Sequence, residues 1–216
     1  MADTPTIKTI GVIGAGQMGN GIAHVSALSG YDVILSDVSL ERAQSALNVI
    51  SGNLDRQLSK DLISKSDKDA ALARINPSGD LSEMRAAQIV IEAATENEAL
   101  KKQIFSDVCP HLSDDAILCT NTSSISITRL AASTDRPERF MGMHFMNPVP
   151  VMQLVELIRG IATDETTYKV VHKLALAMGK TIATSEDFPA FIVNRILMPL
   201  SLIPISEPTR HSSSAY

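Results

Sequence analysis

Apolar and polar positions alternate near the start of the chain in a way that predicts a strand, a tight turn and a helix. Residues 7–13 form a short apolar, β-branched run, which is too short for a helix and typical of a buried parallel strand. From Met18 onward, apolar residues recur at helical spacing as far as Gly30, where we expect the helix to end. The next apolar run, residues 32–35, predicts a second buried strand that leads into Asp37.

The same alternation of strands and helices continues through the middle of the chain. Ser39 is a candidate cap for a helix that runs towards Leu58, and residues 64–74 carry another helical pattern. Asn97 is expected to cap a further helix, which Pro110 ends. We also predict strands at residues 88–93, 116–120 and 140–145, and a turn at residues 76–79. This pattern favours an α/β fold with a Rossmann-type, doubly wound and mostly parallel sheet.

The turn after the first strand has the glycine spacing of a dinucleotide-binding site. Gly14 would permit the tight turn, Gly16 would let a pyrophosphate approach the backbone, and Gly19 would let the helix pack closely on the strand. Gln17 and Met18 lie between these glycines, at a helix start whose free N–H groups would face the anion. Glycine-rich turns occur in many loops, so the strand before this one and the helix after it are what favour a cofactor site.

Asp37 is the second element of the predicted cofactor site. It ends the second strand, 23 residues after Gly14. A carboxylate at this point accepts hydrogen bonds from the ribose hydroxyls of an adenosine and repels a 2′-phosphate. We therefore predict that the cofactor is NAD and not NADP.

Polar residues follow the later strands, where the carboxyl ends of a parallel sheet form one ligand-binding crevice. Glu96 follows the strand at residues 88–93, and residues 121–124 (Asn-Thr-Ser-Ser) follow the strand at 116–120. His144 lies near the end of the strand at 140–145. We expect all of them to open onto the same crevice.

Five motifs now stand in one order along the chain, at residues 14–19, 121–124, 144–150, 154–156 and 191–195. Together they resemble the NAD-binding domain of short-chain L-3-hydroxyacyl-CoA dehydrogenases, and most closely the bacterial 3-hydroxybutyryl-CoA dehydrogenases, over about residues 7–200. The resemblance implies oxidation of an (S)-3-hydroxyacyl-CoA, with 3-hydroxybutyryl-CoA as the expected substrate and NAD as the cofactor. It also implies a family homodimer that forms through a C-terminal helical domain. Another Rossmann oxidoreductase, such as a 3-hydroxyacid dehydrogenase, would need a different base.

The resemblance assigns catalytic roles that also have a physical logic. His144 would take the hydroxyl proton, because an imidazole titrates near neutral pH. Glu156 lies in the apolar run 154–158 and is either a solvated side chain on an edge strand or a buried acid paired with His144. Ser123 and Asn194 would hydrogen-bond the substrate oxygen. Alternatively, a serine of this stretch (Ser123, Ser124 or Ser126) caps the short helix predicted from about residue 125.

The family's ligand contacts are carried over onto matching positions of this chain. Glu96, Lys101 and Asn147 correspond to residues on the ribose and nicotinamide side of NAD. Lys60 matches a position near the phosphates of CoA, although a lysine on a polar helix face is usually only solvated. Asn53 stands where the family commonly has serine, and Ser123 is also assigned to the substrate.

Composition and charge narrow the remaining possibilities. With 216 residues, 44% hydrophobic and 20% charged, the chain is long enough for one α/β domain. The net charge of −5 argues against a nucleic-acid or anionic membrane partner. Cys109 and Cys119 show no metal-binding spacing and favour a cytoplasmic protein, and we predict no metal site. The late apolar run at 196–205 contains two prolines and is too short to span a bilayer.

The pattern changes towards the end of the chain. We expect an NAD-binding domain at residues 1–188, the start of a truncated helical domain at 189–200, and an atypical, disordered tail at 201–216. Apolar residues at 192, 193, 196 and 197 would form an uncovered helical face that favours self-association. The alternative function is therefore a fragment that binds NAD with little turnover.

Overall fold

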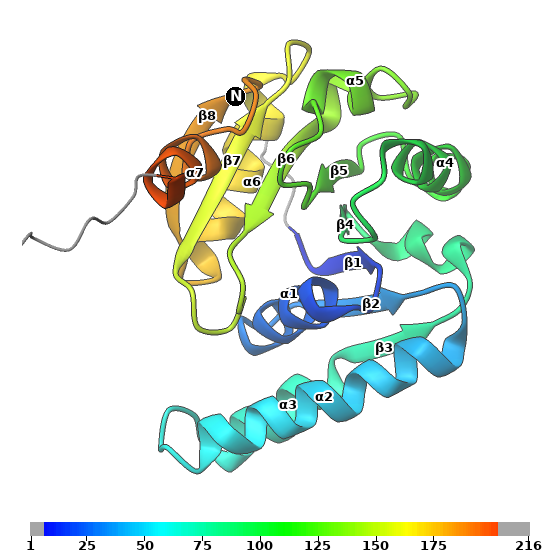
Figure 1. Ribbon diagram of the computed structural model, residues 1–216. Helices are drawn as coiled ribbons and strands as arrows, with labels where there is room; N and C mark the ends of the chain where they lie inside the picture. Colours follow the sequence, from blue (N-terminus) through cyan, green and yellow to red (C-terminus); the bar gives the residue numbers. More distant parts are fainter. Residues whose placement is uncertain (1–6, 203–216) are drawn as a thin grey trace, which may run out of the picture.

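The computed structural model describes residues 7–202, and its described part is built around one eight-stranded sheet (Figure 1). The strands are β1 (Thr9–Ile13), β2 (Asp32–Ser36), β3 (Ile75–Ser78), β4 (Ile89–Glu92), β5 (Ile117–Thr120), β6 (Phe140–Phe145), β7 (Leu154–Arg159) and β8 (Thr181–Glu186). The α-helices are α1 (Gln17–Leu28), α2 (Leu40–Leu58), α3 (Lys65–Ala73), α4 (Glu98–Val108), α5 (Ile127–Ala131), α6 (Glu165–Ala177) and α7 (Val193–Leu202). Short 3₁₀ helices are η1 (Leu81–Ala86), η2 (Cys109–His111) and η3 (Pro137–Arg139).

The strand order is β3-β2-β1-β4-β5-β6-β7-β8, which confirms the predicted doubly wound topology. Neighbouring strands are parallel except for β6 and β7, which pair antiparallel. The chain therefore reverses its winding between β1 and β4, and ligands bind outside the carboxyl ends of the strands at such a point.

Apolar side chains cover both faces of the sheet, as a doubly wound fold requires. On one face Ile22 of α1, Ile50 of α2 and Val171 of α6 belong to a single buried cluster. On the other face Phe105 of α4 packs edge-to-face on Phe140 of β6, with ring centroids 4.9 Å apart. The central strands are buried between these two layers, and their ends remain available for polar groups.

Residues 76–79 were predicted to be a turn, and this prediction is wrong. Residues 75–78 form the outer strand β3, whose Asn76 and Pro77 pair with Ile34 and Leu35 of β2. Proline is tolerated because the carbonyls of Arg74 and Ser78 accept hydrogen bonds from the amides of Val33 and Asp37, so the backbone nitrogen of Pro77 points away from β2. The turn-forming residue types therefore misled the local prediction.

The predicted helix starts agree closely with the structure. Ser39 accepts a hydrogen bond from the amide of Arg42, and Asn97 accepts one from the amide of Leu100. Among the serines left open as caps for the helix near residue 125, Ser126 is the one that caps α5.

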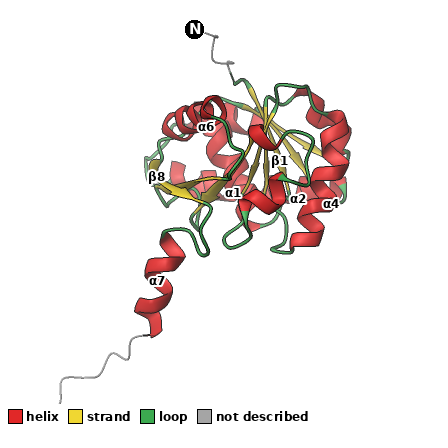
Figure 2. Cartoon of the chain, turned by 90° about the horizontal axis from the view of Figure 1, so that it is seen from above, coloured by secondary structure: helices red, strands yellow, loops and turns green. Residues whose placement is uncertain are grey.

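The last described helix begins later than its sequence pattern indicates. Pro189 was expected to open it, but α7 starts at Val193, after a turn in which Ala190 and Phe191 have φ of +66° and +47°. These left-handed conformations are unusual for residues with a side chain. Figure 2 shows α7 extending away from the sheet, and Ile196 and Leu197 are each 55% exposed. The predicted tail lies outside the described residues from 203 onward.

Candidate active site

The glycine loop between β1 and α1 has the geometry that a dinucleotide requires. Gly14 adopts a φ of +99°, and its amide donates to the carbonyl of Ser36. A Cβ on Gly19 would lie 1.6 Å from the carbonyl oxygen of Gly14, so only glycine lets α1 pack this closely. A Cβ on Gly16 would meet nothing within 4 Å, and the loop is therefore open on the side where a pyrophosphate would approach.

The start of α1 leaves backbone donors for an anion. Gly16 is the N-cap residue and supplies no side-chain acceptor, and the first turn contains no acidic residue. The Gln17 side chain is exposed beside the loop, whereas Met18 packs against the apolar core. The backbone of Met18 lies in the first turn of α1, beside the loop.

Asp37 lies directly beside the glycine loop. Its Oδ2 accepts a hydrogen bond from the amide of Ala15 at 2.7 Å, and its Oδ1 accepts one from the amide of Val38 at 2.8 Å. The Nε of Arg42, on α2, also lies 2.8 Å from Oδ1. The carboxylate is thus fixed beside the glycine loop, with a guanidinium next to it.

A buried polar network connects the ends of β4 and β5 with α4. The Nζ of Lys101 lies 2.7 Å from Oε1 of Glu92, and the hydroxyl of Thr120 donates to Oε2 of Glu92 at 2.6 Å. Both members of the ion pair are almost completely buried. The Nζ of Lys101 also lies 3.5 Å from Oε2 of Glu96. Glu96 therefore connects the buried ammonium to the crevice.

Glu96 holds the loop after β5. Its Oε1 accepts hydrogen bonds from the hydroxyl of Thr122 at 2.6 Å and from the amide and hydroxyl of Ser123 at 2.9 and 3.2 Å. Burial acts to raise the pKa of Glu96, but these hydrogen bonds and the charge of Lys101 outweigh it and lower the pKa. The structure thus brings Glu96 and Ser123 together at one crevice as predicted. Lys101, which was expected to contact NAD, is instead buried behind Glu96.

His144 and Glu156 face each other across the antiparallel strands β6 and β7, where they are register partners. The Nδ1 of His144 lies 2.7 Å from Oε2 of Glu156, and the two side chains are 10% and 0% exposed. The expected pairing is therefore present, and the alternative of a solvated Glu156 on an edge strand is wrong because β8 covers that side of β7. Phe191 adds a ring 6.2 Å from the imidazole.

Asn194, on α7, joins the same group of residues. Its Nδ2 donates to the carbonyl of Ser123 at 2.9 Å, which connects α7 to the loop after β5. The predicted catalytic residues His144, Glu156, Ser123 and Asn194 are therefore linked through contacts from four different segments of the chain.

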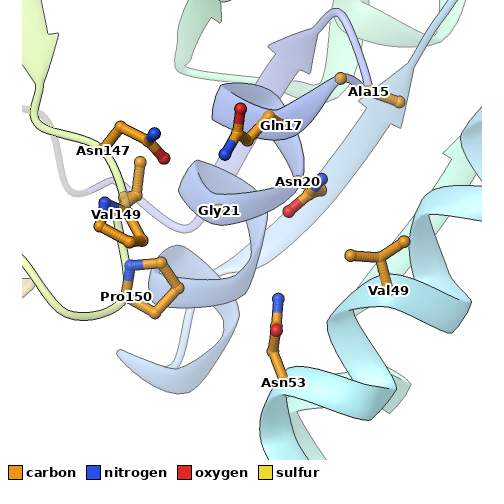
Figure 3. A pocket seen from close by; sticks show the side chains of 11 residues that line it. Ala15, Gln17, Asn20, Gly21, Val49, Asn53, Asn147, Val149 and Pro150 are labelled. Atoms are coloured by element: carbon orange, nitrogen blue, oxygen red, sulfur yellow. The ribbon is translucent and has the colours of Figure 1, made fainter.

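A pocket of 430 Å³ with a mixed polar and apolar lining lies between α1, α2 and the loop after β6 (Figure 3). Four predicted ligand contacts line it: Gly16, Gln17, Asn53 and Asn147. The carboxamide of Asn20 lies among them and was not predicted from the sequence. Lys60, in contrast, is exposed beyond the end of α2 and does not line the pocket.

Sequence reasoning missed two further contacts at the site. The amides of Ile192 and Val193 donate to Oε1 of Glu156 at 2.9 and 2.8 Å. The carboxylate of Asp187 accepts from Ser126 and from the amides of Ile127 and Thr128, so it caps α5 from a distant segment. For Glu156 the available signal was an acidic residue in an apolar run, which does not identify its partners, and Asp187 has no such signal.

A protein-family model described as "3-hydroxyacyl-CoA dehydrogenase, NAD binding domain" matches residues 9–188 of the chain. The chain belongs to this family. Membership confirms the resemblance inferred from the motifs and the prediction of NAD as the cofactor.

Individual relatives of this 3-hydroxyacyl-CoA dehydrogenase domain agree with the family assignment. A 3-hydroxybutyryl-CoA dehydrogenase of Bradyrhizobium diazoefficiens is 57% identical over 194 residues, which are 90% of this chain and 66% of the relative. One from Mycobacterium tuberculosis is 40% identical over 92% of this chain and 70% of its own length. The crystal structure of (S)-3-hydroxybutyryl-CoA dehydrogenase from Ralstonia eutropha superposes with a TM-score of 0.89 at 47% identity, covering 90% of this chain and 69% of that one. The chain thus spans about two thirds of the length of these relatives.

The described residues contain neither a cluster of metal-binding side chains nor a membrane-spanning helix. Histidine, cysteine and carboxylate side chains within residues 7–202 form no group of three that could hold a metal ion. Among the helices in the same part of the chain, none is long and apolar enough to cross a membrane.

Proposed function

We propose that this chain oxidises (S)-3-hydroxyacyl-CoA to 3-oxoacyl-CoA with NAD, and that 3-hydroxybutyryl-CoA is its substrate. The observation that carries the proposal is the buried contact between His144 and Glu156, located at the carboxyl edge of the sheet in a member of this family. The names of the relatives supply the substrate class.

His144 is proposed to act as the base. Its Nδ1 is occupied by Glu156, so Nε2 is the ring nitrogen left to accept the hydroxyl proton of the substrate. Bound NAD would supply the hydride acceptor for the carbon that carries this hydroxyl. The proton then resides on His144, and the carboxylate of Glu156 stabilises the imidazolium that forms.

Ser123 and Asn194 are proposed to hydrogen-bond the substrate oxygen as it changes from alcohol to ketone. Ser123 has a hydroxyl and Asn194 a carboxamide, and the bond from Asn194 to the Ser123 carbonyl keeps the two side chains close together. Such fixed donors favour the charge that develops on the oxygen without reorganisation during the reaction.

The cofactor is proposed to lie along the edge from α1 to β5. Gly14, Gly16 and Gly19, with the backbone at Gln17 and Met18, would hold the pyrophosphate, and Asp37 would accept the ribose hydroxyls. Glu96 and Asn147 would lie on the nicotinamide side of NAD. The ammonium of Lys101 would hold the Glu96 carboxylate in place.

The acyl-CoA is proposed to use the carboxamide-lined pocket. Asn53 lines it from α2, and Asn20 and Asn147 offer further neutral donors and acceptors that suit the amide groups of a CoA chain. Lys60 is exposed near the end of the same helix and would contact phosphate only outside the pocket.

Two measurements on the purified chain test this function. Consumption of NADH is followed with acetoacetyl-CoA, and NADH affinity is measured by fluorescence in parallel. Turnover that His144→Gln abolishes while NADH still binds supports the proposal. NADH binding without turnover in the unmutated chain would instead identify an NAD-binding fragment, and the absence of both would contradict the proposal altogether.

A further inference from the structure

Helix α7 begins on the side chain of Glu156. The carbonyl of Ile192 accepts the amide of Ile196, so Ile192 is the residue before the first helical turn, and its apolar side chain cannot act as a cap. The amides of Ile192 and Val193 donate instead to Oε1 of Glu156, which lies 36 residues earlier in the chain. A glutamate of the central sheet therefore caps this helix.

The two oxygens of Glu156 have separate partners. Oε1 receives the two amides of α7, and Oε2 receives Nδ1 of His144. His144 is the titratable group that faces Glu156 from β6, and Ala183, the register partner on β8, carries no charge. Arg195 is the charged residue of the first turn of α7, and it is exposed. The carboxylate thus connects the imidazole directly to the start of α7.

We propose that α7 is a positioning element for His144: its first two amides fix the carboxylate of Glu156 and limit how strongly this carboxylate attracts the imidazolium. The inference rests on the proposed role of His144 as the base. It assigns the backbone N–H groups of Ile192 and Val193 a part in the pH dependence of the reaction.

The physical argument concerns the distribution of negative charge on Glu156. A buried carboxylate that donors satisfy on one oxygen is less basic on the other, so it favours a protonated partner less strongly. Burial acts to raise the pKa of Glu156, but the hydrogen bonds from His144 and from the amides of Val193 and Ile192 outweigh it and lower the pKa. Removing one amide should therefore shift the sharing of the proton towards the imidazole.

Other contacts fix the start of α7 at this place. Phe191 is buried next to His144 at 2% exposure, and Asn194 donates to the Ser123 carbonyl. Asp187 ties the preceding segment to the start of α5. The approach of the two amides to Glu156 is therefore part of a wider attachment of α7 to the site.

Val193→Pro tests the proposal, because proline removes the N–H donor yet is well tolerated at the first position of a helix. Val193→Ala changes the side chain but keeps the donor. Lys65→Pro places the same residue at the first position of α3, after the extended Ser64 and away from the site. All three are compared with the unmutated chain in oxidation of 3-hydroxybutyryl-CoA by NAD, as a function of pH.

For Val193→Pro we expect the acidic limb of the kcat/KM profile to move to higher pH by about half a unit. Val193→Ala and Lys65→Pro should leave the limb in place. A folded Val193→Pro chain with an unshifted profile would overturn the proposal. If the unmutated chain has no turnover, the proposed function fails, and the measurement of amide exchange described next still decides whether Glu156 fixes α7.

Hydrogen exchange of the Ile192 and Val193 amides gives this second readout without activity. Glu156→Gln keeps an oxygen acceptor and should retain slow exchange, whereas Glu156→Ala removes the acceptor and should speed exchange at both amides about tenfold or more. Equal protection in the glutamine and alanine variants would show that Glu156 does not cap α7. That result would overturn the inference even if Val193→Pro failed to fold.

Discussion

Replacement of Lys101 by methionine is expected to destabilise the chain strongly. The ammonium of Lys101 lies 2.7 Å from Glu92, and the two side chains are 1% and 0% exposed. Methionine fills a similar volume without charge. The variant would therefore leave the Glu92 carboxylate buried with the amide of Ala94 and the hydroxyl of Thr120 as its hydrogen-bond donors.

The expected loss follows from the cost of a buried charge without a counter-ion. Removing one partner of a buried pair typically costs about 3–5 kcal/mol. For a chain of this size, each kcal/mol lowers the midpoint of thermal unfolding by about 2–4 °C, so a decrease of roughly 6–20 °C is expected. The double variant Glu92→Gln with Lys101→Met removes both charges and should regain most of this loss.

Thermal unfolding followed by circular dichroism measures the effect, with Lys102→Met as the control. Lys102 is the next residue of α4 and pairs with Glu98 at 2.9 Å, but both side chains are partly exposed. A pair of this kind contributes only about 0.3–0.5 kcal/mol, so the control should change the midpoint by about 2 °C or less. NADH affinity of the Lys101 variant, measured below its unfolding range, should fall because Glu96 loses its support.

Two results would refute this reasoning. If Lys101→Met and Lys102→Met unfold at similar temperatures, the buried pair does not need its counter-ion. If the double variant is as unstable as Lys101→Met alone, the loss does not come from an uncompensated charge on Glu92.

Three further predictions concern cofactor choice, chemistry and acid stability. Asp37→Ala should narrow the preference for NADH over NADPH by about tenfold or more, because it removes the ribose acceptor and frees Arg42; equal affinity for both in the unmutated chain would exclude this role. His144→Gln should lower kcat for acetoacetyl-CoA by at least about a hundredfold with unchanged NADH affinity, and near-normal kcat would remove His144 from the mechanism. The pKa of Glu156 is lowered by folding, so its contribution to stability is complete above about pH 4.5 and is lost as the pH falls further. The urea midpoint should therefore fall more steeply below that pH in the unmutated chain than in Glu156→Gln, and parallel curves would contradict the shift.

Much of the fold was predictable because its signals are local. The apolar runs of β1, β2, β4, β5 and β6, the glycine loop and the caps at Ser39 and Asn97 each depend on residues close together in the sequence. The motif order also identified His144 and Glu156. For Glu156 a second signal was its position in an apolar run, where an acid needs a partner. Strand β3 was missed because Asn76 and Pro77 favour a turn, and only pairing with β2 makes them a strand.

The contacts that could not be predicted join segments far apart in the chain. Asp187 caps α5 from about sixty residues away, and Glu156 caps α7 although no local pattern indicates it. Asp37 was predicted as a ribose acceptor, but its contact with Arg42 was not predicted. The long side chain of a surface arginine on α2 can point in many directions. Periodicity determines which face of an element is buried, and the choice among polar partners depends on the tertiary structure.

The outward-facing Pro77 has a consequence for how copies of this protein avoid one another. An outer strand offers unpaired N–H and C=O groups to any extended chain, and this is a route to aggregation. On β3 the outward-facing position at residue 77 has no N–H, so an added strand would lose a hydrogen bond there. At the opposite edge β8 exposes Thr181, Thr184 and Glu186, which place polar groups and a charge where a second sheet would have to align. Both margins of the sheet therefore discourage growth by strand addition.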